Sequence, residues 1–136
     1  LKNTSIDVQA QSATAVLERV RTTTGNFKFN YGNDPNHKFS QVMAFYWLNA
    51  QIKFMVQRVG NFFAKDKNIK VVSWPPVESN AFWDPTGKFV FIGVFSRGVE
   101  FSLGAEVYLH EMGHANLGYA TNFSHYGLTN TDSTKV

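Results

Sequence analysis

The apolar residues of this chain recur at two spacings, and each spacing predicts one kind of element. Residues 40–64 and about 103–119 carry them at the three-and-four spacing of a helix. In the first stretch they extend beyond one stripe, so we expect a core helix that lies between other elements. A shorter helix is predicted over residues 12–21, with Ser12 as its N-cap and Gly25 as its stop. The residues expected on the buried face of the long helix are Val42, Phe45, Tyr46, Asn49, Ile52, Lys53, Val56, Val59, Phe62 and Phe63.

Other stretches alternate apolar and polar residues or form short apolar runs, which is typical of strands. Residues 26–32 and 69–74 are two of these, and Pro75 and Pro76 would end the second. Residues 80–83 and 88–95 are joined by the sequence DPTG, which favours a tight hairpin turn. Together these elements predict an α+β fold, in which a small mixed sheet packs on the long helix and on the helix near residue 110.

Composition narrows the class of protein further. The chain has 136 residues, of which 43% are hydrophobic and 15% aromatic, and this fits one globular domain with a substantial core. The net charge is only +3 and the basic residues are scattered, so we expect no nucleic-acid partner. The absence of cysteine excludes thiolate metal ligands and disulfides. No apolar run reaches the roughly 18–20 residues of a membrane span.

The second helical stretch contains His110, Glu111 and His114 in an H-E-x-x-H motif. Residues four apart lie on one side of a helix, so both imidazoles can bind one ion at the zinc–nitrogen distance of about 2.0–2.1 Å. Glu111 leaves the helix at a different angle, where it can take a proton from zinc-bound water. In a chain of this composition the motif would arise by chance only about 0.004 times, so we interpret it as a zinc site.

Such a site needs a third protein ligand, and the residues after the motif leave alternatives open. His125 lies eleven residues after His114, and it either folds back onto the ion or is a solvated loop residue. The H-E-x-x-H-x-x-G-x-x-H pattern fails, because Ala120 occupies its last ligand position. Asp132 and His125 together could close a purely structural zinc site, but Glu111 would then have no task. The remaining alternative is that the chain ends before its third ligand.

The sequence resembles the thermolysin-like zinc endopeptidases, which are zincin-like proteins, over about residues 40–126. In that family the sequence NAFW marks the edge strand of the substrate cleft, and residues 80–83 repeat it. His110 follows Asn80 by thirty residues, which is the spacing of the family. The resemblance implies that His110 and His114 bind zinc and that Glu111 activates the attacking water.

The resemblance also assigns roles outside the motif. The Asn80 side chain and the Ala81 backbone would hold an extended peptide by strand addition. Tyr126 is the chemical match for the tyrosine that stabilises the oxyanion. Phe82 and Trp83, in contrast, are expected to pack in the core.

Two departures from the family change the expectation for the whole chain. The third zinc ligand of the family is a glutamate on the next helix, whereas Glu111 is the last glutamate here. We therefore expect this chain to be the N-terminal catalytic portion of a larger peptidase, with a C-terminal domain of the same protein as its partner. Glu106 matches a calcium-binding position, but its companion ligands would lie beyond Val136, so we do not expect calcium. A secreted or extracytoplasmic location is implied by the resemblance alone.

The function expected from the sequence is zinc-dependent hydrolysis of peptide bonds in a peptide or protein substrate, with Glu111 activating the water. An alternative from a different class is a noncatalytic zincin-like domain that binds a peptide along the strand at Asn80. A further alternative is an inactive fragment that lacks its third zinc ligand.

Overall fold

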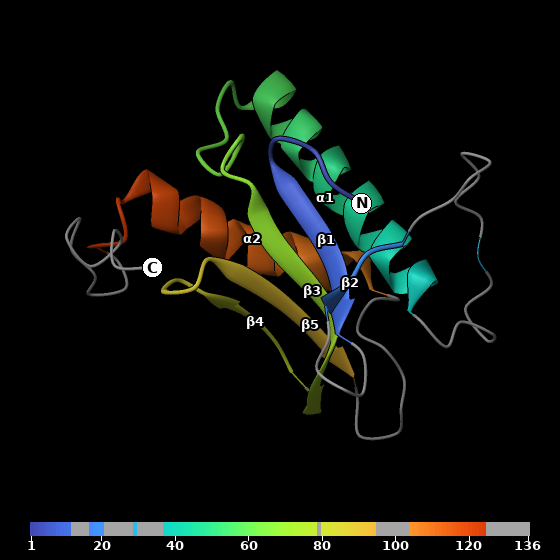
Figure 1. Cartoon of the computed structure of the whole chain (residues 1–136). Coiled ribbons are helices and arrows are strands. Elements are labelled where there is room, and N and C mark those ends of the chain that lie inside the picture. Colours follow the sequence, from blue (N-terminus) through green and yellow to red (C-terminus); the bar gives the residue numbers. More distant parts are fainter. Residues whose placement is uncertain (12–16, 21–28, 30–36, 79, 95–103, 125–136) are drawn as a thin grey trace.

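The computed structural model describes residues 1–11, 17–20, 29, 37–78, 80–94 and 104–124, which form one sheet and two helices (Figure 1). The sheet order is β2-β1-β3-β5-β4; β1, β3 and β5 run parallel, while β2 and β4 pair antiparallel at the two edges. The predicted α+β class with a small mixed sheet is confirmed. The strands are β1 (Ile6–Gln11), β2 (Leu17–Glu18), β3 (Ile69–Glu78), β4 (Ala81–Asp84) and β5 (Phe89–Val94), and the helices are α1 (Lys38–Arg58) and α2 (Ala105–Ala120).

Both helices pack on the same face of the sheet (Figure 1). Side chains alternate between the faces of a strand, and the pairing register aligns Val8 with Val71 and Val71 with Val90. This places one apolar row across three strands, and burial of each such side chain stabilises the fold by roughly 1.5–3 kcal/mol. The residues that fill this core are Ile6, Val8, Ile69, Val71, Val90 and Ile92 of the sheet, Ala44, Leu48 and Ile52 of α1, and Tyr108, Met112 and Ala115 of α2.

The buried face of α1 differs from the prediction. The buried residues are Ser40, Gln41, Ala44, Leu48 and Ile52, and of these only Ile52 was predicted to be buried. Ser40 and Ala44 are small, so the helix backbone can lie close to the sheet there. Apolar residues occur all around this helix, so their pattern does not show which side faces the sheet. Tyr46 is 62% exposed, so the prediction that this helix lies between other elements is wrong on that side.

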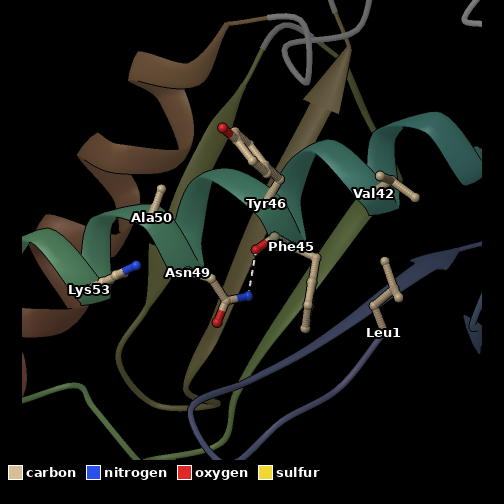
Figure 2. Close-up of a pocket in the computed structure, with 7 residues that line it drawn as sticks. All are labelled: Leu1, Val42, Phe45, Tyr46, Asn49, Ala50 and Lys53. Carbon is tan, nitrogen blue, oxygen red and sulfur yellow. Dashed lines mark hydrogen bonds between the residues drawn. The ribbon is translucent and has the colours of Figure 1, made fainter. Parts of the chain in front are cut away.

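The outward side of α1 instead forms an open apolar groove beside the N-terminal segment (Figure 2). Its volume is about 530 Å³. The side-chain amide of Asn49 in this groove donates a hydrogen bond from Nδ2 to the Phe45 carbonyl at 2.6 Å. Several residues predicted to be buried are therefore groove residues. The groove is lined by Leu1, Val42, Phe45, Tyr46, Asn49, Ala50 and Lys53.

The regular structure described before α1 is β-structure rather than helix. Residues 17–18, within the predicted helix, form β2 and pair with Gln11 and Ala10. β1 itself was not predicted, although Ile6, Val8 and Ala10 alternate with polar residues. Inter-strand pairing outweighs the local helical spacing there. The strand predicted over residues 26–32 lies outside the described residues except for Phe29, which belongs to no element.

Two predicted boundaries are also wrong. α1 ends at Arg58 rather than at residue 64, and Gly60 follows with φ of 84°, a left-handed conformation that glycine adopts without strain. β3 continues through Pro75 and Pro76 to Glu78 instead of ending at residue 74. Its register with β5 shifts between Ser73 and Glu78, and such an irregularity accommodates residues that cannot donate to the ladder.

The hairpin and the motif helix agree with the prediction. β4 and β5 pair antiparallel, and the turn between them is stabilised by the Asp84 carboxylate, which accepts from the Thr86 N–H at 2.9 Å. α2 spans 105–120, within two residues of the predicted bounds. In the described part of the chain, neither helix has the length and apolarity needed to cross a bilayer.

Candidate metal centre

The H-E-x-x-H motif lies on α2 with its histidines directed away from the core. Met112 and Ala115 are fully buried against the sheet, whereas His110 is exposed and His114 is half-buried. A residue two positions from another lies on the far side of a helix, so burial of Met112 turns His110 and His114 outward. The same apolar spacing that predicted the helix therefore orients the motif.

The two histidines have a geometry that fits one zinc ion. Their Nε2 atoms are 3.0 Å apart, and their rings meet nearly at right angles, at 85°. Two nitrogens bound to one zinc ion at tetrahedral angles lie about 3.3 Å apart. A shift of a few tenths of an ångström would bring the pair to that separation. This geometry would allow His110 and His114 to bind a single ion.

Glu111 is the only buried carboxylate on α2, at 7% exposure. Burial raises the pKa of this carboxyl, while the nearby His110 and His114 and a backbone hydrogen bond from Trp83 act in the opposite direction. The carboxylate is thus held beside the histidine pair, against β4. A carboxyl whose basicity is increased by burial is suited to accept a proton.

A cleft runs between α2 and β4 and consists of two adjoining hollows. The first, of about 380 Å³, is lined by Asn80, Ala81, Glu106, Val107, His110 and Glu111. The second, of about 360 Å³, is lined by Ala81, Phe82, Trp83, His110, Glu111 and His114. The two share Ala81, His110 and Glu111. The structure therefore brings the predicted substrate-binding residues and the motif into one cleft.

The hairpin register determines which backbone groups of β4 face this cleft. The Asn80 carbonyl accepts from the Gly93 N–H at 3.1 Å, one step beyond the Ala81–Ile92 pair. Hydrogen-bonding direction alternates along an antiparallel strand, so Ala81 and Trp83 direct their N–H and C=O groups away from β5. Among the described residues β4 is an edge strand, so the N–H and C=O groups of Ala81 lie on an edge that no described strand pairs, and the Trp83 N–H on the same edge bonds Glu111.

The side chains of Phe82 and Trp83 behave differently from each other. Trp83 is 7% exposed and belongs to the core, as predicted. The prediction of core packing is wrong for Phe82, which is half-buried and stacks on Phe91 with ring centroids 4.8 Å apart, on the face of the sheet opposite the helices. The Trp83 backbone, which bonds Glu111, is a site component that the sequence analysis missed. No residue type could have revealed it, because nearly every residue carries an N–H.

The third ligand is not found among the described residues. Within residues 1–11, 17–20, 29, 37–78, 80–94 and 104–124, no three His, Asp or Glu side chains are grouped to hold a metal ion. His125 and Tyr126, the predicted ligand and oxyanion residue, lie outside the described residues. Glu106 is exposed in the first turn of α2, where a negative charge favours the helix dipole.

Comparison with known proteins identifies no relative of this chain. No protein-family model matches the chain, and a search of curated proteins gives no match either. The resemblance to thermolysin-like peptidases therefore depends on residues 80–83 and 110–114 of this chain and on their arrangement.

Proposed function

We propose that this protein is a zinc-dependent peptidase of the thermolysin-like class. The observation that carries the proposal is the position of a buried carboxylate, Glu111, beside two histidine nitrogens 3.0 Å apart, in a cleft bordered by an edge strand. A purely structural zinc site has no use for such a carboxylate. An arrangement that binds an ion, moves a proton and holds a peptide next to both is what hydrolysis requires.

His110 and His114 would hold the ion, and Glu111 would move the proton. When bound, zinc lowers the pKa of a coordinated water molecule and polarises a carbonyl oxygen. Glu111 would accept the proton of the attacking water and then give it to the departing amine. The hydrogen bond from the Trp83 N–H would help to hold the carboxylate in place beside β4.

β4 would hold the substrate as an added strand. The Ala81 backbone groups, which no described strand pairs, can form hydrogen bonds with an extended peptide, and Asn80 lines the same hollow. Recognition through backbone groups reads few side chains, so we propose a broad peptide or protein substrate class. The third ligand in this proposal comes from outside the described residues, with His125 as the candidate in the sequence. The proposed location is secreted or extracytoplasmic.

One observation favours a second candidate function. The described residues provide two metal ligands rather than three. A noncatalytic zincin-like domain would keep the cleft and the edge strand and would bind a peptide without cleaving it.

Zinc content and turnover, measured on the same variants, separate these functions. The chain is loaded with zinc, dialysed against a weak chelator and analysed for metal, and hydrolysis of an internally quenched peptide is then measured. The wild type is expected to retain about one zinc per chain and His110→Ala to retain none. Glu111→Gln should keep zinc but lose at least about a hundredfold in rate. Leu117→Gln changes an exposed residue of the same helix that lines neither hollow of the cleft, so it is the control and should keep both the zinc and the wild-type rate.

The remaining outcomes decide against the proposal. A wild-type chain that binds peptide and never hydrolyses it supports the noncatalytic domain. Retained activity in Glu111→Gln would refute the assigned role of that residue. Failure of the wild type to retain zinc would mean that the 136 residues do not contain a complete site.

A further inference from the structure

α2 is attached to its surroundings by polar contacts as well as by the apolar core. The Tyr108 hydroxyl donates to the Ser40 carbonyl at 3.4 Å, and the Asn116 side chain accepts from the Ala64 N–H at 3.2 Å. Between these two, Gln51 of α1 donates from Nε2 to the Leu109 carbonyl at 3.0 Å. The last contact is the one closest to the motif.

The Leu109 carbonyl belongs to the peptide group that also contains the His110 N–H. A helical carbonyl has a second lone pair, so it can accept from a side chain in addition to its bond within the helix. Gln51 therefore holds the backbone at the start of the motif from the α1 side. Two residues further on, Glu111 is held from the β4 side by the Trp83 N–H. α2 is fixed from both sides within a single helical turn.

Among the described residues, the polar contacts of Gln51 give the fold no clear net stabilisation. Its Oε1 atom is buried and has no hydrogen-bond partner among the described residues, and the same holds for Nε1 of Trp47, one turn earlier on α1. An unpaired buried polar atom destabilises a fold at least as much as one neutral hydrogen bond stabilises it. An apolar side chain of similar size would leave the two helices packed about as well.

We propose that Gln51 is a positioning residue: its bond to the Leu109 carbonyl sets the rotation and axial position of α2, so that Glu111 meets the Trp83 N–H at the edge of β4. The proposed catalytic role of Glu111 rests on the proposed function, but the positioning of α2 does not. Displacement of a reacting group by about 1 Å can lower a rate by roughly a hundredfold. A residue remote from the cleft can thereby control it.

The test compares Gln51→Met and Gln51→Leu with Gln57→Met, which changes an exposed glutamine of the same helix. In metal-free protein the two Gln51 variants should melt at or near the wild-type temperature. Hydrogen exchange of the Trp83 amide should nevertheless accelerate by roughly tenfold or more, because its bond to Glu111 is lost. In zinc-loaded protein kcat should fall by about ten- to hundredfold with little change in KM. Gln57→Met should match the wild type in each measurement.

Two results would overturn the proposal. If Trp83 exchange is unchanged in both Gln51 variants, Gln51 does not position α2 against β4. If both variants unfold or melt well below the wild type, Gln51 is a stability residue instead. A wild type that neither retains zinc nor hydrolyses peptide would refute the proposed function alone, because the exchange measurement requires no metal.

Discussion

Replacement of Met112 by alanine tests whether α2 packs as the structure describes. Met112 is fully buried in the core on the side of α2 opposite His110 and His114. The substitution removes three heavy atoms beyond Cβ, each worth about 0.8 kcal/mol on burial, or about 2.4 kcal/mol in total. The cavity left behind adds to this, since Met→Ala changes in cores cost about 2–5 kcal/mol. We therefore expect a loss of about 3 kcal/mol.

The assay is urea unfolding followed by circular dichroism in the presence of a chelator, so that no metal contributes to stability. In a thermal melt, the same loss of about 3 kcal/mol should lower the melting temperature of a chain of this size by about 10 °C. The matched control is Leu117→Ala on the same helix. Leu117 is 38% exposed, so its replacement should cost less than about 1 kcal/mol.

The comparison of the two variants also tests the orientation of the motif. If Leu117→Ala destabilises the protein as much as Met112→Ala does, α2 is rotated relative to the described structure. The histidines would then not face the cleft. A loss below about 1 kcal/mol for Met112→Ala would equally refute the packing on which the candidate site depends.

Three further changes test the electrostatics and the helix. Glu111→Gln should stabilise the metal-free protein at pH 7 by roughly 0.5–2 kcal/mol. The pKa of Glu111 is raised in the folded state, so the stability of the wild type should fall as the pH rises through the folded-state pKa. Urea titrations in the presence of a chelator should show this pH dependence in the wild type and not in the variant. Asp7, whose pKa is lowered by paired hydrogen bonds from Arg19 at 2.8 and 2.7 Å, should stabilise the fold above its unfolded pKa of about 3.9 and cease to do so as the pH falls through the lower folded value. Asp7→Asn should cost about 2 kcal/mol at pH 7, and an unchanged urea midpoint would contradict this. Gly113→Ala should stabilise α2 by about 0.5–1 kcal/mol, since a Cβ there meets nothing within 4 Å, and a lower melting temperature would show that the position is not an open helical site.

Local signals in the sequence were sufficient for the elements that form the site. The DPTG turn predicted the hairpin because proline and glycine restrict the chain there regardless of what surrounds it. The motif helix was predicted within two residues because Val107, Met112 and their neighbours follow helical spacing. A single amphipathic helix also fixes its own orientation, so the outward position of the histidines could be inferred.

The remaining features depend on residues distant in sequence. The stripe of α1 that faces the sheet is set by close approach at Ala44 and Ser40, and many aromatic residues elsewhere on the helix masked it. β2 forms because β1 is available to pair with it, which a local pattern cannot show. The contact between Gln51 and Leu109 joins residues 58 apart. Sequence spacing carries no information on such contacts.

The fold explains how Asn80 and His110, thirty residues apart in the sequence, come to line the same cleft. β4 leads into β5 through a tight turn, and β5 returns the chain along the sheet, so β4 remains at the edge against which α2 packs. The edge strand and the motif helix then share one cleft, and the Trp83 N–H reaches Glu111 across it. The strand proposed to hold the peptide is thus also the strand that orients the proposed base. A change that moved β4 relative to α2 would disturb peptide binding and proton transfer together, which is why the two motifs are most simply understood as one functional unit.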